Sequence, residues 1–211
     1  MSSTIYRAIA GVFIALCVGL QYALTVHGES LAAVGASSVK FFSFFTILTN
    51  ILAAATLLVP LIAPRSRLGE FLSRPSVRTV VAGYIIMVGT VYYLLLRDLS
   101  QRQGFSQALE LMLHYVTPPL FVIDWALFVP KHNVDWRVGF AALGFPLAYV
   151  VWILVHGALT GWYPYPFLDV SELGYPATLL NIAGLIAVFL ALEVALVAIG
   201  RRLGPDERIG A

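Results

Sequence analysis

The sequence predicts an all-α fold, a polytopic membrane bundle of six transmembrane helices with both termini on the cytoplasmic side. Of the 211 residues, 60% are hydrophobic and only 11% are charged, and the mean hydropathy is +0.87. Because lipid cannot hydrogen-bond to the backbone, a chain this apolar must cross the membrane as helices or as a closed barrel. Its apolar runs of about 20 residues fit helices that cross a hydrocarbon core of roughly 30 Å, whereas barrel strands alternate polar and apolar residues over about ten positions.

Short connections separate the apolar runs, and we expect a single transmembrane domain over residues 1–211. The connections at residues 63–70 and 161–166 contain Gly or Pro together with polar and aromatic residues, which is typical of loops. The first run is long enough to span and no clear cleavage site follows it, so we interpret it as a helix and not as a signal peptide. The predicted helices are Tyr6–Val26, Val39–Ile62, Val77–Leu96, Glu110–Val129, Val138–Ala158 and Tyr175–Ile199.

Basic residues give the orientation, because short cytoplasmic loops carry an excess of Lys and Arg. With the N terminus inside, the cytoplasmic side holds ten of the 13 basic residues and the outer loops hold three. These residues flank the helices and form no patch mixed with aromatic side chains, so no nucleic-acid partner is expected. The single cysteine, Cys17, excludes an internal disulfide. The cytoplasmic basic residues are Arg7, Arg65, Arg67, Arg74, Arg78, Lys131, Arg137, Arg201, Arg202 and Arg208.

Polar residues inside the predicted helices are informative, because such groups cost free energy in lipid and usually face the interior of a bundle. In the second helix, Ser43, Thr46, Thr49 and Asn50 are spaced by three and four residues, which places them on one helical face. Hydroxyl and amide groups of this kind commonly pack helices against one another. For this stripe taken alone, helix packing is the favoured interpretation.

The fourth helix carries a histidine close to two successive prolines. Pro118 and Pro119 remove backbone donors and are expected to kink this helix, which frees carbonyl groups for other partners. A titratable imidazole inside a membrane helix indicates a functional role more strongly than a histidine in a soluble core does. In the sixth helix, Glu193 is expected to reach the cytoplasmic surface or to pair with Arg201 or Arg202, without a chemical role.

The depths of these residues predict a pocket in the outer half of the membrane. The second and fourth helices both enter from the outer face, which puts Thr46 roughly 10 Å deep and His114 about one turn deep. His156 at the outer end of the fifth helix and Asn181 early in the sixth are expected in the same layer. The aromatic segment 162–168 has the composition of a membrane-interface belt and is a candidate cap for the pocket.

Three motifs resemble the androgen-induced protein family and its bacterial six-helix membrane relatives. They are residues 40–50 (KFFSFFTILTN), His114 followed by Pro119 and Asp124, and His156 followed by residues 161–168 (GWYPYPFL). In the animal members, this resemblance implies intramembrane hydrolysis of fatty acid esters of hydroxy fatty acids, by a threonine nucleophile with a histidine partner. It also implies a multi-pass protein of the bacterial plasma membrane.

By motif position, the family's histidine corresponds to His114. A gapless alignment from Lys40 places the nucleophile at Ser43, whereas an alignment on the threonine ahead of Asn50 places it at Thr46, and we favour Thr46. The resemblance then implies that Thr46 attacks a lipid ester after His114 removes its proton. Substrate-binding positions are expected at Ser43, Thr49, Asn50, Tyr115, Thr117, Asp124, His156 and Asn181.

Ten residues along a helix is about 15 Å, so Asp124 is expected to be too far from His114 to orient it. No metal or other cofactor is expected, and the expected partners are membrane lipids and the lipid-ester substrate. The chain has neither a Gly-x-Ser-x-Gly motif nor a His-Glu-x-x-His motif. The alternative is a non-enzymatic lipid or sterol binding protein, or a small transporter, that uses the same pocket. Transport is less favoured because the halves show no repeat.

Overall fold

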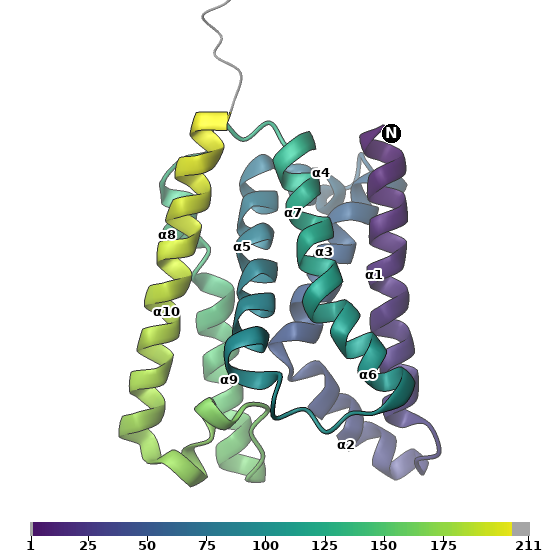
Figure 1. Ribbon diagram of the computed structural model, residues 1–211, viewed down its shortest axis with the longest axis vertical. Helices are drawn as coiled ribbons and strands as arrows, with labels where there is room; N and C mark the ends of the chain where they lie inside the picture. The colour runs from purple at the N-terminus through teal and green to yellow at the C-terminus, as the bar shows by residue number, and fades with distance from the viewer. Residues whose placement is uncertain (1, 204–211) are drawn as a thin grey trace, which may run out of the picture.

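The computed structural model describes residues 2–203, and every regular element in that range is a helix (Figure 1). Six of the helices are long and apolar enough to cross a membrane, so the chain is a multi-pass integral membrane protein and the predicted six-helix bundle is confirmed. Arg208, counted above among the cytoplasmic basic residues, lies outside the described range. The six spans are Ser3–Val26, Phe45–Ile62, Pro75–Leu96, Gly104–Phe128, Arg137–Thr160 and Val170–Arg202.

Four helices form the centre of the bundle: α1 (Ser3–Val26), α3 (Phe45–Ile62), α5 (Pro75–Val91) and α7 (Thr117–Phe128). Their shared core is apolar and excludes solvent completely at several positions. The N terminus of α1 and the C-terminal end of the last helix lie at the same end of the bundle (Figure 1). The membrane side that this end faces stays a prediction from the basic residues. The fully buried core residues include Ile14, Leu57, Ile85 and Phe121.

The predicted single helix Val39–Ile62 is wrong, because the chain breaks it at Ser43 and Phe44. A short helix, α2 (Leu31–Phe42), ends there and α3 begins at Phe45. The Ser43 carbonyl accepts a hydrogen bond of 2.9 Å from the Tyr149 hydroxyl, so a distant side chain takes the place of a helical amide. Phe44 is extended and gives α3 no side-chain cap. α3 therefore begins without a cap from the side chain that precedes it.

Two neighbouring segments widen into π-helices instead of continuing as α-helices. α5 passes into η1 (Tyr92–Leu96), and α6 (Gly104–Leu111) reaches α7 through η2 (Met112–Val116). The Thr117 amide donates to the Met112 carbonyl, five residues back, just before the two prolines begin α7. The prolines were predicted to kink this helix, and the structure has a π-helical turn at that point. Single π-turns of this kind are frequent at functional sites.

The predicted fifth helix is divided between a short α8 (Arg137–Ala141) and α9 (Gly144–Thr160). α9 ends at Gly161, whose φ of 70° is the left-handed value that favours glycine. The loop that follows holds the 3₁₀ turn η3 (Pro166–Leu168). The Tyr163 ring lies directly on Gly157, where a Cβ atom would overlap it, and this contact fixes the loop against α9.

The last helix, α10 (Val170–Leu203), contains a break at Gly174, which has a φ of 71°. Its straight portion therefore begins near Tyr175, as predicted. Between α3 and α5, the chain forms the short α4 (Arg67–Ser73). The expectation for Glu193 is wrong, because its carboxyl group is fully buried against Gly83 of α5 and has no hydrogen-bond partner in the described residues.

Candidate active site

A threonine and a histidine from separate spans meet inside the bundle. Thr46 Oγ1 lies 3.2 Å from His114 Nε2, which is hydrogen-bonding distance. Thr46 belongs to the first turn of α3, and His114 belongs to the π-helical segment η2. Each residue is only 8% exposed. The two side chains are held in place away from bulk solvent, which is the arrangement that an activated hydroxyl nucleophile requires.

A backbone carbonyl sets the orientation and tautomer of the histidine. His114 Nδ1 lies 2.8 Å from the carbonyl oxygen of Glu110. Because a carbonyl only accepts hydrogen bonds, Nδ1 carries the proton and Nε2 is left as the acceptor that faces Thr46. The Tyr92 ring of η1 stacks on the imidazole with a centroid distance of 3.9 Å and an interplanar angle of 22°. His114 is therefore fixed in the geometry of a general base.

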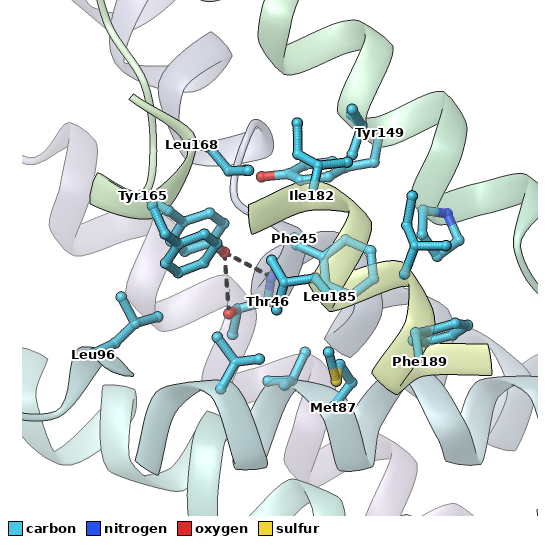
Figure 2. Close-up of a pocket in the computed structure, with 16 residues that line it drawn as sticks. Phe45, Thr46, Met87, Leu96, Tyr149, Tyr165, Leu168, Ile182, Leu185 and Phe189 are labelled. Carbon is cyan, nitrogen blue, oxygen red and sulfur yellow. Dashed lines mark hydrogen bonds between the residues drawn. The ribbon is translucent and has the colours of Figure 1, made fainter. Parts of the chain in front are cut away.

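Tyr165, from the loop after α9, completes the arrangement around Thr46. Its hydroxyl oxygen accepts from the Thr46 amide at 3.4 Å and lies 3.5 Å from Thr46 Oγ1 (Figure 2). Burial raises the pKa of Tyr165, so the phenol keeps its proton and stays a donor. The sequence predicts this segment only as a membrane-interface belt and a candidate cap for the pocket. The one available signal was a tyrosine between two prolines in a short loop, which does not predict such a contact.

Thr46 lies where two cavities of different chemistry meet. The first, the apolar chamber, lies between α3, α5, η1, α9, α10 and the loop after α9 and has a volume of about 100 Å³. Besides Thr46 and Tyr165 it is lined almost entirely by hydrocarbon and aromatic groups (Figure 2). Its labelled walls in Figure 2 are Phe45, Met87, Leu96, Tyr149, Leu168, Ile182, Leu185 and Phe189.

The second cavity, the polar chamber, lies on the histidine side of Thr46. It has a volume of about 340 Å³ and also reaches Thr46 and Tyr165. Unlike the apolar chamber, it contains His114 and several hydrogen-bonding side chains. Those side chains are Gln21, Ser100, Gln101, Arg102 and Glu110.

Of the two hydroxyl groups that the sequence left open, Thr46 is the one beside His114. The Ser43 hydroxyl donates to the Val39 carbonyl at 2.7 Å and accepts from Trp152 Nε1 at 3.0 Å. Ser43 lines neither chamber, because the helix break turns it away from the first turn of α3. The predicted polar stripe is therefore interrupted.

The remaining polar residues of α3 and α7 support the pair from outside the chambers. Asn50 Nδ2 donates to the Thr46 carbonyl at 2.8 Å and to the Leu113 carbonyl at 3.4 Å, so it connects α3 to η2. Thr49 and Thr117 are fully buried, and their hydroxyls have no partner in the described residues. These three residues line neither chamber.

Asp124 is remote from the pair, in agreement with the distance argument from the sequence. Its carboxylate is fully buried and binds Arg7 Nε at 2.6 Å and Arg78 Nη1 at 2.7 Å. The arginines thus link α1 and α5 to α7. The sequence predicts Arg7 and Arg78 only as basic residues that flank the helices, and the structure places both against a buried carboxylate.

Three other predicted substrate-binding residues also lie outside the two chambers. Asn181 Nδ2 donates to the Phe167 carbonyl at 3.1 Å and so holds η3. His156 lies between the rings of Trp152 and Trp162. Tyr115 is 41% exposed on the outer surface of η2. The polar groups expected from the fifth and sixth helices thus do not reach the pair, and the groups in contact with Thr46 or His114 come from α3, α6, η1, η2 and the loop after α9.

The fold and site define the class of protein as a polytopic membrane protein with a buried threonine–histidine pair at a cavity junction. Within residues 2–203, no group of three or more His, Cys, Asp or Glu residues is placed to hold a metal. The family model described as FAR-17a/AIG1-like protein matches residues 12–198, and the chain belongs to this family. This finding confirms the resemblance to the androgen-induced protein family. No curated protein and no solved structure gave a match.

Proposed function

We propose that this protein is an intramembrane lipid-ester hydrolase in which Thr46 is the nucleophile and His114 is the general base. The observation that carries the proposal is the 3.2 Å contact between Thr46 Oγ1 and His114 Nε2 at the junction of two cavities. The carbonyl of Glu110 takes the orienting position that a carboxylate occupies in many catalytic triads. Family membership is consistent with this chemistry.

In the proposed reaction, Thr46 Oγ1 bonds to the ester carbonyl carbon while its proton moves to His114 Nε2. The tetrahedral intermediate then collapses and the bond between the carbonyl carbon and the alcohol oxygen breaks. His114 returns the proton to that oxygen, which leaves an acyl group on Thr46. A water molecule, deprotonated by His114, hydrolyses the acyl ester and releases the fatty acid.

Stabilisation of the oxyanion is proposed to come from the N-terminal turn of α3 together with Tyr165. The N-terminal turn of a helix presents amide hydrogens and the positive end of the helix dipole. The Tyr165 hydroxyl oxygen is within 3.5 Å of both the amide nitrogen and the hydroxyl oxygen of Thr46, and it accepts from that amide, so its own proton is available to the oxyanion that forms beside Thr46. Preorganised donors of this kind stabilise the developing negative charge.

A lipid ester suits this site because an apolar chamber adjoins the nucleophile and the whole site lies in a membrane-spanning bundle. Fatty acid esters of hydroxy fatty acids are the substrate class that the family resemblance implies, and we propose a substrate of this kind. The distribution of basic residues predicts that the site lies in the outer leaflet.

Labelling with an alkyl fluorophosphonate in detergent or nanodiscs tests the proposal. Wild type is expected to be labelled, and Thr46→Ala and His114→Ala are each expected to lose labelling and ester hydrolysis. Ser43→Ala, a matched hydroxyl removal three residues away, is expected to keep both. Labelling that survives in both Thr46→Ala and His114→Ala contradicts the mechanism.

The alternative, a lipid or sterol binding protein without turnover, is favoured only by the apolar character of the first chamber. It predicts that a lipid co-purifies unchanged with wild type and with Thr46→Ala. Mass spectrometry of the bound lipid, before and after incubation, separates retention from hydrolysis.

A further inference from the structure

The two chambers differ in chemistry, and only one of them contains the base. The geometry points to a fixed placement of the substrate, with the fatty acyl chain in the apolar chamber and the leaving alcohol in the polar chamber. This inference rests on the proposed hydrolase function and names the binding site for each half of the ester. Thr46 and Tyr165 line both chambers, whereas His114 lines the polar chamber and not the apolar one.

The position of His114 decides the orientation. After Thr46 has bonded to the carbonyl carbon, His114 must return the proton to the departing alcohol oxygen, so that oxygen lies on the imidazole side. The carbonyl carbon carries its acyl chain in the other direction. From Thr46, that other direction leads into the apolar chamber.

The apolar chamber suits a hydrocarbon chain of limited length. In Figure 2, Tyr165 and Leu96 lie at one end of it, Leu185 and Met87 lie near the middle, and Phe189 lies at the opposite end. Phe189 stacks on Tyr84 with a centroid distance of 5.2 Å, and the Tyr84 hydroxyl donates to the Ala142 carbonyl at 2.7 Å. This packing holds Phe189 in place at that end, and we expect it to limit the length of the acyl chain.

The polar chamber suits an alcohol that bears further oxygen groups. Arg102 Nε lies 3.8 Å from Glu110 Oε1, and the Ser100 hydroxyl donates to Glu110 Oε2 at 2.5 Å. The chamber thus offers both donors and acceptors, with one positive and one negative side chain. These groups bind one another, and their remaining donor and acceptor positions are available to further oxygen groups on an alcohol, which a plain hydrocarbon does not offer.

A chain-length series of alkyl fluorophosphonates tests the placement, because the alkyl chain stays on phosphorus while fluoride leaves from the alcohol position. For wild type, the labelling rate is expected to rise with chain length by about fourfold per buried methylene and then to fall once the chamber is filled. Leu185→Trp is expected to move that maximum to shorter chains.

Val188→Trp is the matched control, since Val188 lies three residues along α10, is 55% exposed and lines neither chamber. It is expected to keep the wild-type profile. If Leu185→Trp is not labelled at any length, Leu185→Ala replaces it and is expected to move the maximum to longer chains.

A second experiment varies the alcohol half of the ester substrate. Leu99→Trp, in the polar chamber, is expected to reduce hydrolysis of esters with bulky alcohols and to leave the chain-length maximum in place. A maximum that moves in Leu99→Trp and not in the Leu185 variants overturns the placement while the hydrolase stands. Absence of labelling in wild type overturns the proposed function itself and the placement with it.

Discussion

The hydroxyl oxygen of Tyr165 lies 3.4 Å from the backbone nitrogen of Thr46 and 3.5 Å from its Oγ1, although the two residues are 119 positions apart. The ring is fixed by stacking on Phe167 at a centroid distance of 5.2 Å and by an edge contact with Phe44. A hydrogen-bond donor held so close to a nucleophile has the position of an oxyanion donor.

Tyr165→Phe keeps the packed ring and removes only the donor. We expect kcat to fall by about 10-fold to 100-fold, toward the loss seen when an oxyanion donor is removed from other hydrolases, with little change in KM. Steady-state hydrolysis of a fatty acyl ester measures this, and thermal unfolding in detergent serves as the check on folding. An unchanged kcat in a stably folded variant would assign Tyr165 to packing alone.

Asn50 is expected to position Thr46 by connecting α3 to η2. Asn50→Leu leaves the carbonyls of Thr46 and Leu113 without this donor. We expect the free energy of unfolding to fall by about 1–3 kcal/mol, and kcat to change more than KM. The matched control is Thr49→Val, which removes a fully buried hydroxyl that has no hydrogen-bond partner in the described part of the chain. That control is expected to be neutral or slightly stabilising. Equal effects of the two substitutions on kcat would contradict a specific role for Asn50.

Asp124 is expected to contribute to the stability of the fold and not to catalysis. Asp124→Asn leaves Arg78, which is 3% exposed, without its counter-charge, and we expect a loss of about 3–5 kcal/mol. Arg7→Gln is expected to cost less, because the Arg7 side chain is 18% exposed and Arg78 still neutralises the carboxylate. Thermal unfolding in detergent gives the order of the two losses. A larger loss of stability in Arg7→Gln, or a fall in kcat per folded molecule in Asp124→Asn, would contradict a purely structural role for Asp124.

The spans were predictable because an apolar run of sufficient length has few alternatives in a membrane. The meeting of Thr46 with His114 was also accessible, since two helices that enter from one face place residues of similar depth in one layer. The helix break at Ser43 was not predictable, because the Tyr149 hydroxyl that donates to the Ser43 carbonyl lies 106 residues away in the sequence. Tyr165 was missed for the same reason: its role depends on how a loop folds back, and composition does not reveal this.

For the charged residues too, the sequence predicts position along a helix but not contacts with residues far away in the sequence. The charge pattern marked Arg7 and Arg78 as residues near helix ends, and both do lie near the ends of their spans. It did not reveal that a carboxylate on a third helix binds both of them. Which charged residues pair inside a bundle depends on how each helix is rotated about its axis. When a helix carries polar groups on more than one face, neither hydropathy nor residue spacing determines that rotation.

Gly89 provides the close approach that brings η1 and η2 together at the histidine. A Cβ atom there would lie 3.0 Å from the His114 carbonyl oxygen and 3.3 Å from Pro118 Cγ, so Gly89→Ala forces α5 and η2 apart by a few tenths of an ångström. Because Tyr92 on η1 stacks on the imidazole, this shift also moves His114 relative to Thr46. A small displacement of a catalytic group lowers the rate more than it lowers stability, and we expect kcat to fall by about tenfold to 100-fold.

The matched control for this substitution is Gly184→Ala in α10, where a Cβ atom meets nothing within 4 Å. That variant is expected to keep wild-type kcat and to unfold at the same or a higher temperature, since alanine is the better helix former by about 1 kcal/mol. Hydrolysis rates of the two variants, compared at equal folded fraction, test the contact directly. A Gly89→Ala protein as active as Gly184→Ala would mean that the imidazole keeps its place without the close packing of α5, and that the carbonyl of Glu110 alone is sufficient to hold it.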